Sequence, residues 1–241
     1  MIKFFRKIRQ RLVAENKFTQ YLIYALGEIV LVVVGILIAL QINNWNEAQK
    51  DHAYEVKMLT EIVKGLETDK LNLLEHKAAY IKLKTTVDYF VSLSGNHVLF
   101  HDSLYQRLWV LNTGRYFQFN SGIYGALKSS GIDRISNDSL RNHLINFYDF
   151  RLPVFENKME HNTRNYRPNV ETLLSFLGES YVDDNNSLSL GVMSEDLLQK
   201  PAFLNLLGHI EWRASNSIHS IEDFIPEMDA LIERINTEIE Q

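Results

Sequence analysis

The sequence predicts an all-α protein in which one N-terminal transmembrane helix continues into an external helical bundle. Three observations support this fold class. An apolar run of membrane-spanning length lies close to the N-terminus. Apolar residues then recur at a spacing of three and four over a long stretch after this run, and again at the C-terminal end of the chain. Between the two stretches, shorter patterns of the same kind are separated by Gly, Pro, Asn and Ser.

Residues 21–42 form the predicted transmembrane helix. Every residue from Ile29 to Leu40 is apolar apart from Gly35. At about 1.5 Å per residue these 22 residues span about 33 Å, which is enough for a bilayer core of about 30 Å. Aromatic residues of the kind that anchor a span at the interface stand at its two ends: Tyr21, Tyr24 and Trp45. A helix in a soluble core rarely has so long an apolar surface on every side, so we expect a membrane anchor.

The charges on either side of this helix predict its orientation. Residues 1–20 hold six basic residues and one acidic residue, whereas residues 43–241 hold 19 basic and 28 acidic residues. Because basic residues beside a span stay in the cytoplasm, we expect residues 1–20 inside and residues 43–241 outside. A cleaved signal peptide is the main alternative, since it also joins a basic start to an apolar run. Glu28 within the run and the lack of a convincing small-x-small cleavage site favour an uncleaved anchor.

Residues 1–20 also have a helical pattern of their own. Apolar residues recur on one face and basic residues fill the others, which predicts a basic amphipathic helix on the anionic inner leaflet. A disordered orientation signal accounts for the same composition equally well. No nucleic-acid partner is expected, because the basic run is short and the rest of the chain is acidic.

The opening of the chain resembles a known family. The segments MIKFFRKIRQRLVAENK and YLIYALGEIVLVVVGILIALQINNWNE, within residues 1–47, are similar to the start of a domain-of-unknown-function family of single-span Gram-negative envelope proteins. Residues 126–131 and 137–141 match it more loosely. The resemblance implies a bacterial inner-membrane protein whose C-terminal domain is periplasmic. It implies no activity, substrate or catalytic residue. Cysteine is absent, which excludes disulfide bonds but does not identify the compartment.

The first long helical pattern follows the span without a strong breaker. Apolar residues at a three-four spacing run from Val56 to Val91, and Ser94-Gly95-Asn96 is expected to end the helix. We expect the apolar face to shift gradually around the helix, so that Leu74 and Ile81 also belong to it. Lysines interrupt the pattern at seam positions, which favours a helix packed in a bundle over a long coiled coil: Lys70, Lys77 and Lys84.

Shorter helices are expected in the middle of the chain. We expect one helix at residues 121–130, which ends at Gly131. Ser136 or Asn137 is expected to cap the start of the helix that follows. Pro153 breaks or kinks this second helix, and residues 170–177 form another. Residues 178–194 are rich in Asp, Asn and Ser and predict a mobile loop. A last long helix starts at Pro201 and continues in phase past Pro226.

The sequence holds no motif that indicates catalysis. It lacks a phosphate-binding loop, a dinucleotide glycine fingerprint, a Gly-x-Ser-x-Gly elbow and a paired Glu-x-x-His set. His97 and His101 have metal-ligand spacing, but Gly95-Asn96 predicts a solvated loop there. His219 and Asp223 predict an ordinary surface pair. We therefore expect no enzyme activity, cofactor or metal.

An aromatic-rich segment favours core packing, with a peptide or ligand groove as the alternative: Tyr105, Trp109, Tyr116, Phe117, Phe119 and Tyr124.

Glu28 is the one ionisable residue inside the predicted span. An ionised carboxylate at mid-membrane costs about 2.5–3.5 kcal/mol on insertion scales, and less near the edge. At about 100° per residue, Gly35 and Ala39 lie within about 20° of Glu28 on either side. Gly35-x-x-x-Ala39 is a small-xxx-small pattern, which lets helices approach closely. We therefore expect a helix contact at this face, with titration of Glu28 or its reach to the inner interface as alternatives.

Two functional hypotheses follow from these patterns. The first is a non-enzymatic, membrane-anchored envelope protein whose periplasmic bundle serves interaction or sensing. Its expected partners are the lipid bilayer and either a second copy of the chain or other envelope membrane proteins. The alternative is a subunit of an ion- or proton-coupled membrane complex in which Glu28 titrates. A single span cannot form an ion path, so this alternative requires partner subunits.

Overall fold

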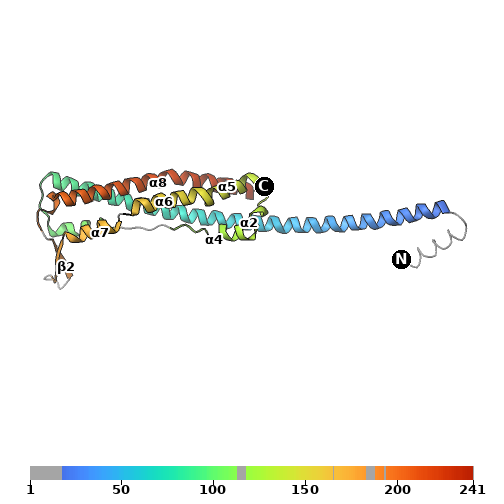
Figure 1. Ribbon diagram of the computed structural model, residues 1–241, viewed down its shortest axis with the longest axis horizontal. Coiled ribbons are helices and arrows are strands. Elements are labelled where there is room, and N and C mark those ends of the chain that lie inside the picture. The colour runs from blue at the N-terminus through green and yellow to red at the C-terminus, as the bar shows by residue number, and fades with distance from the viewer. Residues whose placement is uncertain (1–17, 113–117, 165, 183–187, 193, 241) are drawn as a thin grey trace. The chain divides into compact units, whose positions relative to one another are not determined.

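The computed structural model describes residues 18–112, 118–164, 166–182, 188–192 and 194–240 (Figure 1). The contacts divide the chain into two compact units, Met1–Glu55 and Val56–Gln241. The predicted amphipathic segment lies almost wholly outside the described residues. The all-α fold class is confirmed, because helices make up nearly all of the described structure.

Helix α2 (Phe18–Gly95) contains the whole apolar run and the long pattern that follows it. Its 78 residues include no proline, which explains why the backbone hydrogen bonds continue without a break. The helix ends at Gly95, as predicted. His97 then takes a backbone φ of 54° in the loop that follows. A single element therefore carries both the candidate span and one wall of the bundle.

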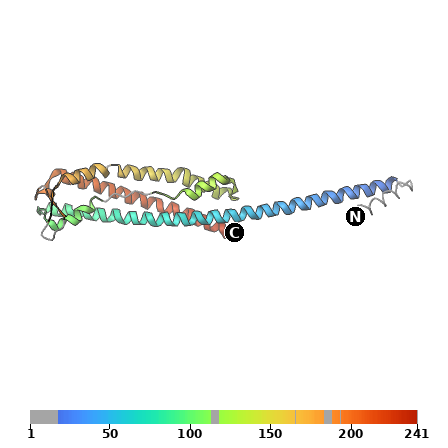
Figure 2. The same cartoon turned by 90° about the horizontal axis from the view of Figure 1, so that it is seen from below.

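In the second unit, three long helical rods pack along one another. They are the C-terminal part of α2, helix α8 (Pro201–Ile239), and a continuous rod of α5 (Asp138–Asn146), η3 (Phe147–Arg151) and α6 (Leu152–Thr163). Figure 2 shows α6, α8 and α2 side by side in this unit. Helix α8 continues past Pro226, as predicted. Short helices flank the rods: η1 (Asp102–Leu104), α3 (Tyr105–Val110), α4 (Gly122–Gly131), η2 (Ile132–Arg134), α7 (Tyr166–Ser175) and η4 (Leu197–Gln199).

The core of the bundle is filled by the apolar faces of these rods. On α2 the buried residues include Leu59, Leu66, Leu73, Tyr80 and Val87, all of which the spacing predicts. The expected drift of the apolar face is wrong. Leu74 and Ile81 are 41% and 47% exposed, because each lies about 100° from the buried row. Val91, at the end of the predicted row, is 50% exposed although its angular position matches the row.

Aromatic rings make up much of the core near the middle of the bundle. Phe224 of α8 stacks on Phe155 with 4.3 Å between ring centroids, and on Phe147 at 5.5 Å. Phe119 meets both Phe155 and Phe224 edge to face at 5.8 Å. Such pairs contribute about 0.5–1.5 kcal/mol each beyond the area they bury. The cluster therefore joins α6, η3 and α8 to the segment before α4.

The start of α5 confirms the predicted cap. The side-chain oxygen of Asn137 accepts hydrogen bonds from the backbone N–H groups of Ser139 (2.9 Å) and Leu140 (3.1 Å). These are two of the first N–H groups of a helix, which have no partner within it. Just upstream, α4 ends at Gly131 with a φ of 102°, a backbone conformation that glycine adopts without strain.

Pro153 neither ends nor interrupts the rod. The π-helical segment η3 comes directly before α6, and Pro153 is the second residue of α6. Proline lacks an N–H group, and its ring clashes with the carbonyl four residues back in a regular α-helix. The wider π-helical turn avoids this clash and lets the rod continue.

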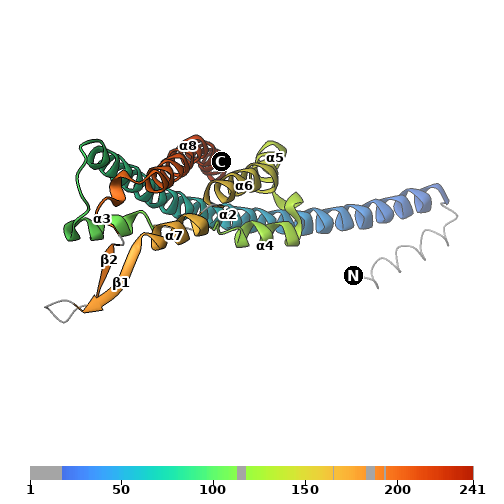
Figure 3. The ribbon, with the colours of Figure 1, turned by 60° about the vertical axis from the view of Figure 1, so that its left-hand side comes forward.

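The predicted loop at residues 178–194 is wrong in part. Strands β1 (Leu177–Val182) and β2 (Leu188–Val192) form an antiparallel hairpin after α7, which Figure 3 shows. The register pairs Ser180 with Leu190 and Val182 with Leu188. Backbone pairing between the strands satisfies N–H and C=O groups that a loop would leave to water. The alternation of Leu188, Leu190 and Val192 was a strand signal, but polar residues on either side of it favoured a loop.

Candidate functional site

No described residue of its own unit covers the apolar run of α2. Every large aliphatic side chain from Ile29 to Leu40 is 47–73% exposed. By length and composition the helix could cross a membrane, and none of its most apolar stretch is buried. A core helix meets the same length criterion but would be mostly buried. Contiguous exposed apolar surface of this extent marks a site that a membrane or another protein covers.

The predicted site residues of the span all lie on α2. Glu28, Gly35 and Ala39 are exposed, and a Cβ atom added at Gly35 would meet no atom within 4 Å. Trp45 is 65% exposed. The side chains of Tyr21 and Tyr24 lie outside the described residues. The face is therefore open to a neighbouring helix, while the contact itself and the role of Glu28 stay predictions.

In the bundle, the lysines that interrupt the apolar pattern of α2 form ion pairs with α8. Lys70 pairs with Asp229 at 2.5 Å and Lys77 pairs with Glu222 at 2.7 Å. Both the lysines and their partners are seven residues apart, so they define one antiparallel register between the helices. The repeated lysines therefore position α8 against α2.

The third pair of this row is shifted by one helical turn. Continuing the register would place Ser215 opposite Lys84. Ser215 instead donates a hydrogen bond to Glu211 (2.8 Å), and Glu211 pairs with Lys84 at 2.5 Å. These contacts lower the pKa of Glu211, with the hydrogen bond from Lys84 as the largest cause. We call the three pairs the lysine ladder.

One acidic side chain of α2 lies inside the bundle. Asp69 is only 4% exposed, and its carboxylate accepts a hydrogen bond from the backbone N–H of Asn120 at 3.1 Å. Burial raises the pKa of Asp69, and the hydrogen bond from Asn120 opposes this rise. Asp69 thus connects α2 to the segment before α4 at the cost of desolvating a carboxyl group.

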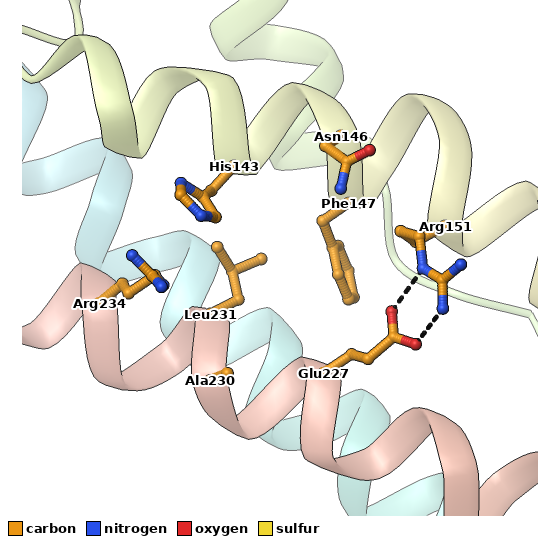
Figure 4. A pocket seen from close by; sticks show the side chains of 8 residues that line it. All are labelled: His143, Asn146, Phe147, Arg151, Glu227, Ala230, Leu231 and Arg234. Carbon is orange, nitrogen blue, oxygen red and sulfur yellow. Dashed lines mark hydrogen bonds and ion pairs between the residues drawn. The ribbon is translucent and has the colours of Figure 1, made fainter.

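A pocket of about 210 Å³ opens between the α5–η3 rod and α8 (Figure 4). Phe147 and Leu231 supply apolar surface to it. A second hollow, of about 440 Å³, adjoins it toward the start of α5 and shares Ala230 and Arg234 with it. The small side chain of Ala230 leaves space between the helices. The first pocket is lined by His143, Asn146, Phe147, Arg151, Glu227, Ala230, Leu231 and Arg234.

Of the two arginines that line this pocket, one has an ion-pair partner and the other has none among the described residues. The guanidinium of Arg151 donates two hydrogen bonds to the carboxylate of Glu227, one of them 2.7 Å long from Nε. This pairing raises the pKa of Arg151, and the opposite charges of the pair neutralise each other. Arg234 forms no ion pair with any described residue. The pocket therefore carries one uncompensated positive charge when His143 is neutral.

The imidazole of His143 has a defined tautomer. Its Nδ1 lies 2.6 Å from the backbone carbonyl oxygen of Ser139. A carbonyl oxygen only accepts, so Nδ1 must carry the proton. Nε2 is left to accept a hydrogen bond, or to donate one when the ring is protonated. Figure 4 shows His143 and Arg234 extending from facing helices toward the same space.

The other candidates of the sequence analysis do not combine into a site. His97 and His101 lie in the loop after α2, and the described residues include no group of three possible metal ligands. His219 and Asp223 form an exposed pair at 3.5 Å. Of the aromatic segment, Phe119 and Tyr124 are buried and Trp109 is 41% exposed. Tyr116 and Phe117 lie outside the described residues.

Sequence reasoning did not identify the pocket. Its residues come from two helices about 80 positions apart in the chain, and they match no motif of fixed spacing. In the sequence, the only feature that its ionisable residues share is their charge. His143, Arg151 and Arg234 are ordinary surface residues until the packing of α5 on α8 brings them together.

The described residues thus form an all-α protein with one candidate membrane helix and a helical bundle. Residues 28–215 match the family of unknown function DUF6090, and the chain belongs to this family. The match supports the resemblance to a domain of unknown function and extends from the candidate span into α8. Comparisons with curated proteins and with solved structures give no match.

Proposed function

We propose that the chain is a non-enzymatic, single-span protein of the bacterial inner membrane whose periplasmic bundle serves interaction or sensing. One observation carries the proposal: the aliphatic side chains from Ile29 to Leu40 are all 47–73% exposed on a helix long enough to cross a bilayer. Exposed in water, this surface would lose the favourable free energy of apolar burial. A bilayer covers it from all sides.

The charge distribution supports the proposed orientation. The six basic residues before the span favour a cytoplasmic N-terminus, and residues 43–241, with their net negative charge, are then outside. The exposed face with Gly35 and Ala39 supports a second copy of the chain as the first partner, with another envelope membrane protein as the alternative.

Topology is the direct test of the proposed location. Reporter fusions after Trp45 and near Gln241 are expected to be active only outside the cytoplasm. Protease added to inside-out vesicles is expected to spare the bundle, and digestion of the bundle would show the opposite orientation. The mass of the membrane-extracted protein is expected to include the first residues. Loss of the residues before about position 43 would instead establish a cleaved signal peptide.

An exposed acid in the apolar helix favours a second candidate function, the ion- or proton-coupled complex. Here Glu28 titrates, so Glu28→Gln inserts and assembles normally but does not restore function to the deletion strain, while Glu28→Asp restores part of it. If Glu28 only supports packing, Gln substitutes with little loss, since its amide still donates and accepts hydrogen bonds. A fully functional Glu28→Leu variant would exclude both roles.

A further inference from the structure

We propose that the pocket between the α5–η3 rod and α8 is a binding site for a single carboxylate group, held by Arg234 together with His143. The carboxylate belongs either to a small organic acid or to the C-terminus of a peptide. The inference rests on the proposed binding role of the bundle and gives it a ligand class. It does not depend on the membrane location.

Arg234 is available to bind a ligand at the pocket. The other arginine of the pocket, Arg151, is neutralised by Glu227 through two hydrogen bonds. Arg234 makes no ion pair among the described residues, although it lines both hollows. A guanidinium presents parallel N–H groups that match the two oxygens of one carboxylate. An unpaired arginine at a pocket is therefore a ready donor for such a group.

His143 provides a second polar contact on the opposite wall. Its Nδ1 proton is used by Ser139, so Nε2 remains for the ligand. In the protonated ring Nε2 donates to a carboxylate oxygen, and in the neutral ring it accepts from a protonated acid or a water. The other polar groups that line the pocket are Asn146, the paired Arg151 and Glu227, and Arg234, which extends toward the same space as His143 (Figure 4).

The charge and the lining of the pocket favour a monoanion with an apolar part. Arg151, Glu227 and Arg234 together carry one net positive charge. Glu233 and Glu238 line the adjoining hollow, so a doubly charged phosphate would meet unfavourable charge there. Phe147 and Leu231 offer apolar contact to a short hydrocarbon chain. A pocket of about 210 Å³ accommodates a ligand of a few carbon atoms.

The test is ligand-observed NMR on the full chain in detergent micelles, with butyrate as the probe. We expect saturable binding of butyrate in the millimolar range and none of its neutral isostere butyramide. Arg234→Gln is expected to weaken butyrate binding about tenfold or more. Ala230→Leu is expected to abolish it by filling the space that both hollows share. Arg167→Gln, an exposed arginine of α7, is the matched control and is expected to bind as the unmutated protein does.

Further probes distinguish a peptide C-terminus from a free organic acid and test phosphate as another ligand. Binding of trialanine more tightly than butyrate, and not of trialanine amide, would identify a peptide C-terminus; the reverse order would identify a free acid. Phosphate that binds more tightly than either would overturn the carboxylate assignment. So would absence of saturable butyrate binding, or equal binding by the unmutated protein and Arg234→Gln, provided that thermal unfolding shows both to be folded. Neither result would bear on the topology of the span.

Discussion

Asp69 shows how one residue links packing to pH. Asp69 is only 4% exposed in the folded bundle, and its carboxylate accepts a hydrogen bond from the N–H of Asn120. Because burial outweighs this hydrogen bond, the folded protein raises the pKa of Asp69 above its ordinary value. The folded state therefore binds a proton at this site more readily than the unfolded state does.

The sign of this linkage predicts the effect of Asp69→Asn. In the unmutated protein the contribution of Asp69 to stability is fully present below its unfolded pKa of about 4, and it is lost as pH rises through the higher folded pKa. Asparagine stays neutral and can still accept from Asn120. In urea unfolding at pH 7, we expect the free energy of unfolding of Asp69→Asn to equal or exceed that of the unmutated protein. Between pH 4 and pH 7, the variant is expected to lose less of its free energy of unfolding than the unmutated protein does.

The matched control for this substitution is Glu67→Gln, an exposed carboxyl group two residues away on α2. It is expected to leave the pH profile of the unfolding midpoint unchanged. A decrease in stability for Asp69→Asn at pH 7 would contradict the argument, because it would mean that the charged carboxylate strengthens the Asn120 contact more than desolvation weakens it.

At the scale of helices and strands, the long regular elements could be predicted and the irregular ones could not. A three-four spacing over many turns identified α2 and α8, and a side-chain cap at Asn137 identified the start of α5. Strands β1 and β2 are stabilised by pairing with each other, which a local pattern does not reveal. The seven-residue recurrence of Lys70, Lys77 and Lys84 was visible in the sequence, but its meaning depended on the acids of α8.

The lysine ladder predicts a charge-swap result. Lys77→Glu places two carboxylates opposite each other, and Glu222→Lys places two ammonium groups together. Each single variant is expected to lower the free energy of unfolding by about 1 kcal/mol, the upper range for partly exposed pairs. The double variant restores an attractive pair and is expected to recover most of this loss in urea unfolding.

Lys82→Glu is the control for the ladder, since Lys82 is exposed on the same helix and forms no ion pair with a described residue. It is expected to change the unfolding free energy much less than Lys77→Glu. If the two single variants at positions 77 and 222 lose stability additively in the double variant, the pair does not couple α2 to α8.

At the scale of the whole molecule, the expected partner is a second copy of the chain. The sequence predicts a contact face from Gly35, Ala39 and Glu28, and only a second helix would show whether it is used. Gly35→Leu is expected to reduce self-association in lipid vesicles, measured by energy transfer between labelled chains, because its side chain keeps the backbones apart. The loss is expected to be several-fold.

Val33→Leu, on another face of α2 and similar in size and apolarity, is expected to keep the energy transfer of the unmutated protein. Equal losses for Val33→Leu and Gly35→Leu would remove the small-residue face as the contact. Absence of self-association in the unmutated protein would leave other envelope membrane proteins as the partner to be sought.

The π-helical segment η3 is a place where the rod can tolerate a change in its number of residues. A π-helical turn holds about one residue more than an α-helical turn, so it behaves as a one-residue insertion in the rod. Removing Phe150, which is 62% exposed, would let a regular α-helical turn form while the flanking residues keep their faces, provided that Pro153 is also replaced by alanine, because a regular turn brings the proline ring against the carbonyl four residues back. Removing Lys158 from α6 would instead rotate Met159 and Asn162 by about 100° out of the core. Within this rod, η3 is where one residue can be lost without rebuilding the bundle once Pro153 has been replaced.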